Sequence, residues 1–208
     1  MHYKYLKDVS YFILIVIKSK SNFKKSAPSF RMPEDKTLPI VLVGAGSGIA
    51  PFRSFWQERK VDKEIFNENV TGLNGRGWSE MSLYFGCRRP DHDELFRNEI
   101  DQMISEKVIN KYHPAYSRQP TVEKTYVQHL LSKNTRYIFD AIYKQKGHFY
   151  VCGDVRMAAE VTLTLENALQ CEGKMTSDEA KRYVNEMKEN QRFHEDIFGI
   201  NASLQSTK

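Results

Sequence analysis

The sequence predicts an α/β fold in which a doubly wound, mostly parallel sheet of five strands carries helices on both faces. Short apolar runs of strand length alternate along the chain with longer segments of helical periodicity, which is typical of parallel sheets. A glycine-rich turn joins the first apolar run to the helical segment after it. With 27% charged and 40% hydrophobic residues among 208, the chain has the composition of an ordinary globular domain.

The alternation gives four of the five strands and the helices that follow them. As strand and then helix, the pairs are 38–43 with 50–60, 81–87 with 93–106, 109–116 with 126–144, and 148–152 with 157–171. A further helix is expected over 177–192, because Thr176 is a suitable N-cap and Glu179 stands three residues after it. Residues 67–79 are rich in glycine and are expected to form a mobile surface loop.

The ends of the chain are expected to lie outside the nucleotide-binding domain, which we place at 38–199. The apolar run 11–17 is too short for a bilayer span, which needs about twenty residues. No small-residue cleavage site follows the run, so a strand that belongs to a missing upstream part explains it better than a targeting segment. Residues 1–37 are therefore interpreted as an irregular segment and linker, and 200–208 as a disordered tail.

Charge and cysteine content narrow the classes of partner. The formal net charge of +5 would attract polyanions, but the basic residues are spread among 26 acids, so a nucleotide phosphate explains the surplus as well as a nucleic acid does. We expect no nucleic-acid partner. The three cysteines have neither a paired framework nor a metal-ligand spacing, so no metal site is expected and a reducing, cytoplasmic location is predicted.

The segment 44–52, GAGSGIAPF, predicts a phosphate-binding turn. A buried strand, a turn of glycines and a helix N-terminus with free N–H groups together form a cradle for a phosphate, and the expected ligand is a dinucleotide. The third glycine comes one residue earlier than in the G-x-G-x-x-G fingerprint, so a plain strand-to-helix turn is the alternative.

Other groups suited to a dinucleotide follow the remaining strands. In open parallel sheets, ligands bind outside the carboxyl ends of the strands. The residues expected there, after the glycine turn, are Gly86, Cys87, Arg88 and Arg89, then Tyr116, Ser117 and Arg118, and then Cys152, Gly153 and Asp154. Each of the four strand ends offers a glycine or a cation, the small or positive groups that a pyrophosphate and a second phosphate require.

The segment after the third strand predicts a preference for NADPH over NADH. Lys124, Tyr126 and Gln128 occupy alternate positions, so an extended segment would present an ammonium, a phenol and an amide on one side. With Ser117 and Arg118, they form a pocket for the 2′-phosphate of adenosine, in which Tyr126 stacks on adenine. The alternative is an ordinary loop followed by a solvated start of a helix.

Six segments, in order, resemble the NADPH-binding module of the diflavin reductases, which has the nucleotide-binding fold of ferredoxin-NADP reductases. They are 44–56 (GAGSGIAPFRSFW), 85–89 (FGCRR), 115–118 (AYSR), 124–128 (KTYVQ), 151–158 (VCGDVRMA) and 193–199 (FHEDIFG). Within that group the chain most resembles the C-terminal reductase portion of nitric oxide synthases, over about residues 29–199.

The resemblance implies roles for individual residues. Pyrophosphate and ribose contacts are implied for Gly46, Ser47 and Gly48, and further cofactor contacts for Arg88, Gly153 and Asp154. The residues that correspond to the holders of the 2′-phosphate end are Ser117, Arg118, Lys124, Tyr126 and Gln128.

The same resemblance places three residues at the redox end. Cys152 and Asp196 would lie beside the nicotinamide. There the neutral thiol is small and polarizable, and the carboxylate favours a ring that becomes cationic as hydride leaves. Phe198 would stack on the flavin and move aside for the nicotinamide. The alternatives are a buried core cysteine, a solvated acid and a core aromatic of an edge strand, respectively.

The expected activity is hydride transfer from NADPH to FAD. The FAD would be held mainly by a flavin domain, whose motifs are absent from residues 1–37 and which would act in cis or in trans. In a full-length parent, electrons would pass through FMN to a haem oxygenase that makes nitric oxide from arginine, and calmodulin would bind only regions absent here. The isolated chain is expected to be incomplete and inactive. The alternatives are an NADPH-haemoprotein reductase fragment and a non-catalytic NADP-binding fragment; Phe198, where the former branch has tryptophan, favours the synthase.

Overall fold

The computed structural model describes residues 30–66, 77–120 and 123–199, and those from Arg31 onward belong to one compact unit. The predictions for 1–29, for most of the loop 67–79 and for the tail 200–208 lie outside the described residues. In the part of the chain that is described, no helix is long and apolar enough to cross a membrane.

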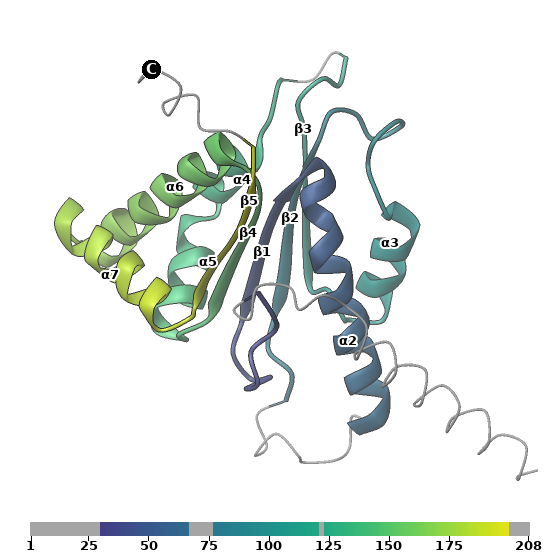
Figure 1. Cartoon of the computed structure of the whole chain (residues 1–208), viewed down its shortest axis with the longest axis horizontal. Helices are drawn as coiled ribbons and strands as arrows, with labels where there is room; N and C mark the ends of the chain where they lie inside the picture. The colour runs from purple at the N-terminus through teal and green to yellow at the C-terminus, as the bar shows by residue number, and fades with distance from the viewer. Residues whose placement is uncertain (1–29, 67–76, 121–122, 200–208) are drawn as a thin grey trace, which may run out of the picture. The chain divides into compact units, whose positions relative to one another are not determined.

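Five parallel strands form one sheet, which confirms the predicted fold class (Figure 1). The strands are β1 (Ile40–Ala45), β2 (Met81–Cys87), β3 (Lys111–Tyr116), β4 (His148–Asp154) and β5 (Phe193–Phe198), in the order β3-β2-β1-β4-β5. The first four match the predicted runs to within two residues at either end. The fifth, which the sequence pattern did not locate, lies at the edge of the sheet beside β4.

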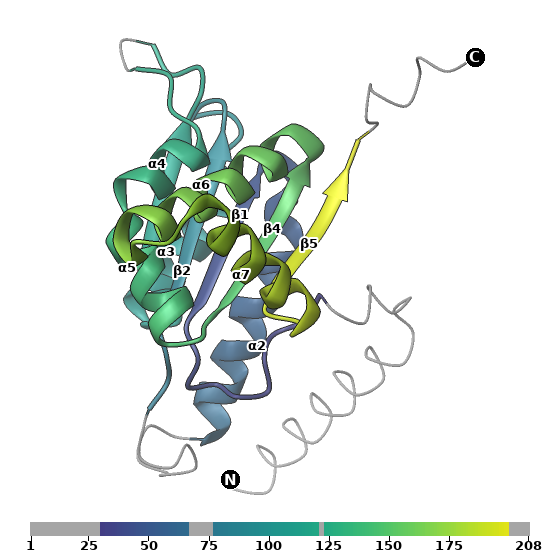
Figure 2. The same ribbon diagram turned by 90° about the vertical axis from the view of Figure 1, so that its left-hand side faces the viewer.

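Helices cover both faces of the sheet, as Figure 1 and the turned view in Figure 2 show. On one face lie α2 (Ala50–Phe66) and α3 (Arg97–Ser105), and on the other lie α4 (Val127–Lys133), α5 (Thr135–Phe139), α6 (Val155–Gly173) and α7 (Ser177–Glu189). The helices that follow β1 and β2 lie on one face, and those that follow β3 and β4 lie on the other. The sheet is therefore doubly wound, and the boundary between the neighbouring strands β1 and β4 is a switch point where a ligand can bind.

Three helix predictions differ from the structure. Helix α2 continues to Phe66, six residues beyond the predicted end at 60. The segment 126–144 is not one helix but α4, α5 and the π-helix η2 (Asp140–Lys144), because Asn134 leaves helical geometry and its side chain donates a 2.8 Å hydrogen bond to the Leu130 carbonyl. Helix α3 begins at Arg97 rather than 93, because Phe96 has a left-handed backbone (φ +60°) and ends the preceding turn. The predicted capping box of α7 is confirmed, since Thr176 and Glu179 bond to each other's backbone N–H.

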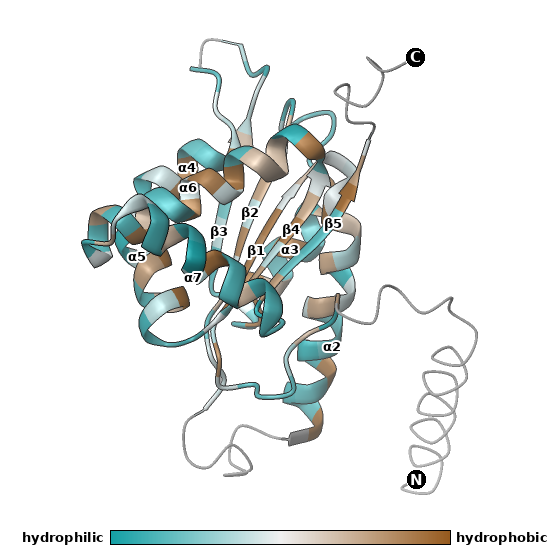
Figure 3. Ribbon diagram, turned by 60° about the vertical axis from the view of Figure 1, so that its left-hand side comes forward, coloured by the Kyte–Doolittle hydropathy of each residue, from teal (hydrophilic) through white to brown (hydrophobic). Residues whose placement is uncertain are grey.

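The core lies between the strands and the two helix layers. Figure 3 shows apolar strand residues inside the sandwich and hydrophilic residues on the outer sides of the helices. On the α2 face, the Phe55 ring packs edge-on against Tyr150 of β4 with centroids 5.0 Å apart. On the other face, Val41 and Val43 of β1 pack with Val161 of α6 and are fully buried. Burial on both faces explains why the central strands are continuous apolar runs.

Candidate functional site

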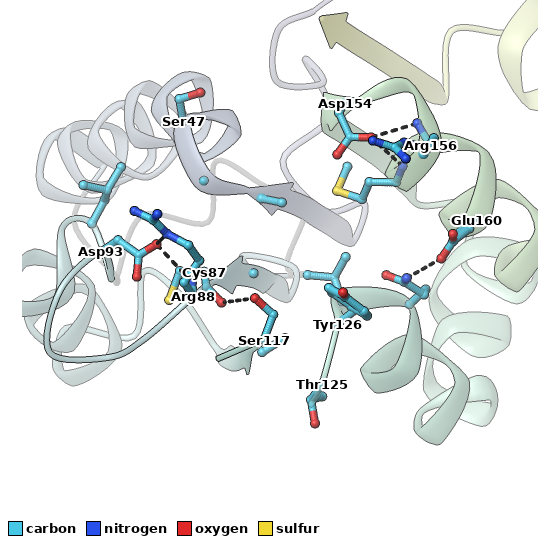
Figure 4. Close-up of a pocket in the computed structure, with 18 residues that line it drawn as sticks. Ser47, Cys87, Arg88, Asp93, Ser117, Thr125, Tyr126, Asp154, Arg156 and Glu160 are labelled. Carbon is cyan, nitrogen blue, oxygen red and sulfur yellow. Dashed lines mark hydrogen bonds and ion pairs between the residues drawn. The ribbon is translucent and has the colours of Figure 1, made fainter. Parts of the chain in front are cut away.

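A cavity of about 740 Å³ opens at the carboxyl ends of β1, β2, β3 and β4, a size within the usual range for small-molecule sites. Its walls also include the N-terminal turns of α4 and α6. In Figure 4, Arg88 and Asp93 lie on one side of the open centre, and Arg156 and Glu160 lie on the other. Seven of the predicted cofactor-binding residues line this cavity: Gly46, Ser47, Arg88, Ser117, Tyr126, Gln128 and Asp154.

The glycine turn after β1 forms the short 3-10 helix η1 (Gly46–Ile49), which leads directly into α2. Gly46 has φ +55° and, with Ser47, is exposed on the cavity wall. Gly48 is buried instead, and a Cβ atom added there would lie 2.1 Å from the carbonyl oxygen of Cys152. The structure therefore gives Gly48 a packing role, in which it lets the turn close on β4.

The end of β2 supplies a cation that an acidic neighbour holds in place. Asp93 accepts a hydrogen bond from Arg88 Nε at 2.9 Å and from the backbone N–H groups of Arg88 and Arg89 at 3.0 and 2.7 Å. Burial alone would raise the pKa of Asp93, but these bonds and the Arg88 charge lower it to about 2. The carboxylate is thus ionised at neutral pH and fixes the Arg88 side chain, which is 62% exposed at the cavity.

Backbone hydrogen bonds join the segment after β3 to the segment after β2. Ser117 N–H donates to the Cys87 carbonyl at 3.0 Å, and Arg118 N–H donates to the Arg88 carbonyl at 2.8 Å. The exposed Arg118 side chain does not line the cavity, but its backbone is bonded to a residue that does. The backbones of two arginines that follow neighbouring strands are therefore held side by side at the carboxyl end of the sheet.

Lys124 and Tyr126 lie together at the entrance to α4. The Lys124 ammonium is 5.0 Å from the centroid of the Tyr126 ring, which is 39% exposed and lines the cavity. Lys124 itself is outside the cavity lining. A cation beside an exposed aromatic ring is the combination predicted for a phosphorylated adenosine.

The structure adds residues that the sequence analysis did not select. Gln128 donates a hydrogen bond through Nε2 to Glu160 of α6, while its Oε1 is buried without a partner. Arg156 and Glu160 both line the cavity, and their i, i+4 spacing puts them on one side of α6. Asp93 and Leu95 line it from the β2 to α3 segment. Arg156 stands two residues past the end of β4, where residues that contact a ligand are expected. This position is the signal by which the sequence could have identified it.

The three residues predicted for the redox end share one face of β4 and β5. Cys152 pairs in register with Asp196, and its Sγ lies 4.0 Å from Asp196 Oδ2. Burial, and to a smaller extent the Asp196 charge, raises the pKa of Cys152 to about 12, so the thiol is neutral. Phe198 pairs with Asp154, which also lines the cavity, and so the two groups of residues adjoin.

These positions bear on the alternative interpretations. The Phe198 side chain is 46% exposed, which argues against a core aromatic. Cys152 is buried, as a core cysteine would be, but it also contacts the carboxylate of Asp196. Gly153 is buried, and a Cβ there would meet the Met157 side chain at 2.6 Å, so Gly153 allows close packing of β4 on α6. Within the described ranges, no cluster of three or more His, Cys, Asp and Glu side chains could hold a metal ion.

Comparison with known proteins gives a consistent result. Residues 42–162 match the oxidoreductase NAD-binding domain family. The chain is 43% identical over 178 residues to inducible nitric oxide synthase of Canis lupus familiaris, covering 85% of the chain and 15% of that protein. The corresponding protein of Homo sapiens is 42% identical over 178 residues (85% and 15%), and that of Mus musculus is 40% identical over 187 residues (89% and 16%). The chain thus spans about one-sixth of the length of these relatives.

Proposed function

Because this chain belongs to the oxidoreductase NAD-binding domain family, and within it is similar to the reductase region of nitric oxide synthases, we propose that it binds NADPH and positions it for hydride transfer to FAD. The observation that carries the proposal is the cavity at the strand ends. There, Arg88, Ser117 and Tyr126 lie beside two more cations, Arg118 and Lys124.

The residues present fit a phosphorylated dinucleotide. Gly46 has no side chain to obstruct a pyrophosphate, and it stands at the start of a helical segment whose N–H groups favour an anion. Arg88 is already oriented by Asp93 and is well exposed, so it can contact a phosphate without rearrangement. At the other end, the Tyr126 ring would stack on adenine, with the 2′-phosphate near Arg118 and Lys124.

The β4 and β5 face fits the nicotinamide end. When bound, NADPH supplies a hydride, and its nicotinamide ring gains positive charge. The carboxylate of Asp196 would stabilise that charge, and the Cys152 thiol, neutral because its pKa is about 12, would fill the space beside the ring without adding a second negative charge. Phe198 is exposed enough to cover a flavin ring and to move away from it.

The remaining steps require more than this chain. We propose that FAD is held mainly by a flavin domain, in cis or in trans. In a longer protein of the nitric oxide synthase kind, electrons would then continue through FMN to haem. The isolated chain is expected to bind NADPH without turnover, and adding a flavin domain is expected to restore reduction of ferricyanide. Binding without any turnover after that addition would favour a non-catalytic NADP-binding protein.

The test of cofactor choice removes the two cations proposed for the 2′-phosphate. Each charge-assisted bond contributes about 1.5 kcal/mol at the low end, which suits exposed side chains, so Arg118→Ala with Lys124→Ala should weaken NADPH binding about a hundredfold. NADH binding should stay nearly constant. The double variant Lys181→Ala with Arg182→Ala, on the exposed side of α7, is the matched control for lost positive charge. Equal losses for NADPH and NADH would contradict the proposed phosphate pocket.

A further inference from the structure

Glu94 is a buried carboxylate in the segment between β2 and α3, and its side chain is only 3% exposed. Its Oε1 accepts hydrogen bonds from Tyr112 OH at 2.6 Å and from Arg97 Nη1 at 3.0 Å. Its Oε2 accepts one from Tyr116 OH at 3.0 Å. A carboxylate is buried at a large cost unless it is paired and hydrogen-bonded, and here three donors from two elements meet that need.

Both neighbours of Glu94 in the sequence belong to the cavity wall. Asp93 holds the Arg88 side chain, and Leu95 lines the cavity directly. Fixing Glu94 therefore also fixes its neighbour Asp93, which holds the Arg88 side chain at the cavity.

One of the two partners of Glu94 on β3, Tyr116, lies between two residues of the other cavity wall, Ala115 and Ser117. Tyr116 is the last residue of β3, and Ser117 and Arg118 follow it immediately. Glu94 thus connects the segment that carries Arg88 to the strand that carries Arg118. The backbone bond from Arg118 to Arg88 joins the same two segments at a second point.

We propose that Glu94 is a positioning residue for the NADPH site, acting through Tyr116 on Arg118 at the 2′-phosphate end and through Asp93 on Arg88. The inference rests on the proposed function, because it presumes that these arginines hold phosphates of NADPH. Glu94 does not line the cavity; it sets the separation of the two segments that do.

The direct test is Glu94→Gln in the full chain, with adenosine 2′,5′-bisphosphate and adenosine 5′-monophosphate as probes in titration calorimetry. An amide keeps the size of the side chain but removes its negative charge and replaces one acceptor oxygen by a donor, so the charge-assisted bonds weaken and a tyrosine hydroxyl facing the amide NH2 must turn from donor to acceptor. The expected result is about tenfold weaker binding of the bisphosphate and a correspondingly smaller preference over the monophosphate. Tyr116→Phe, which removes only a hydroxyl, should reproduce the loss even if Glu94→Gln folds poorly.

The matched control is Glu99→Gln on α3, the helix that follows the Glu94 segment. Glu99 also accepts three side-chain bonds, from Arg53, Trp56 and Gln57, at 2.8 to 3.0 Å, but it does not line the cavity. This control should lower the melting temperature and leave the preference for the bisphosphate unchanged. A role of Glu94 in stability alone would give the same pattern as Glu99, and that outcome would overturn the inference.

A double-mutant cycle tests the route. In an Arg118→Gln background, Glu94→Gln should weaken bisphosphate binding less than it does in the unmodified chain, because the route through Arg118 is gone and only the route through Asp93 to Arg88 remains. Fully additive losses would refute positioning through Arg118. If the unmodified chain does not prefer the bisphosphate to the monophosphate, both the proposed function and the inference fail. If the unmodified chain shows this preference, and Glu94→Gln and Tyr116→Phe both preserve it, only the inference fails.

Discussion

Replacing Gly48 by alanine should separate the glycine turn from β4. The Cβ atom would lie 2.1 Å from the carbonyl oxygen of Cys152 and 2.7 Å from its carbon, both of them backbone atoms. The turn would have to move by about 0.9 Å before even a 3.0 Å contact with that oxygen is reached. Rotation of a side chain cannot relieve this overlap, because the neighbour is the backbone of a central parallel strand.

The expected loss is large for a single methyl group. Overpacking a rigid site costs about 1 to 3 kcal/mol, and a backbone neighbour puts Gly48→Ala near 3 kcal/mol. For a domain of this size, the melting temperature should fall by about 6 to 12 °C. Because the displaced turn also forms the wall of the cavity beside Gly46, NADPH binding should weaken as well.

Gly46→Ala is the matched control. Gly46 has φ +55°, and a Cβ atom at this position would meet no atom within 4 Å, so the cost is backbone strain of about 1 kcal/mol, partly offset by the stiffer unfolded chain. Thermal melting and urea titration of both variants measure the difference. If Gly48→Ala is no less stable than Gly46→Ala, the close packing of this turn on β4 is not the reason that position 48 requires glycine.

Three further outcomes are expected. Asp196→Asn should lower the pKa of Cys152 below about 12 but keep it above the ordinary thiol value, because burial remains the larger cause. The pH dependence of alkylation, with the other cysteines replaced by serine, measures this pKa. An unchanged profile would exclude electrostatic coupling between Cys152 and Asp196. The pKa of Asp93 is lowered to about 2 in the folded chain, so its stabilising effect is full above about pH 4 and is lost as the pH falls through 2; Asp93→Asn should flatten the decrease in urea midpoint over that range. Thr176→Ala should cost about 1 kcal/mol and about 2 to 4 °C in melting temperature, whereas Thr176→Ser, which keeps the cap to Glu179, should melt like the unmodified chain.

Much of the fold could be predicted because its central strands are buried on both faces. Such strands are continuous apolar runs, and they give the alternation its clear signal. Strand β5 was missed because it lies at the sheet edge, where His194, Glu195 and Asp196 interrupt any apolar run. The break at Asn134 was missed because the helical periodicity continues through it.

The positions of the candidate site residues were predictable where these residues follow strands directly. Residues after β1, β2, β3 and β4 do meet at one edge, and Cys152 and Asp196 do lie 4.0 Å apart. The contribution of Glu94 could not be read from the sequence, because its partners Tyr112 and Tyr116 are about twenty residues away and meet it only when the segment before α3 folds against β3. Glu160 likewise reaches Gln128 only through the packing of α6 against α4.

The position of β5 separates the two ends of the proposed site along the chain. The described residues that line the cavity all precede residue 161, whereas the carboxylate beside Cys152 belongs to the last of the described strands. A polypeptide truncated just after α7 would keep those cavity-lining residues and lose Asp196 and Phe198. Because Phe193 of β5 also belongs to the hydrophobic core, such a truncation would in addition expose the edge of β4.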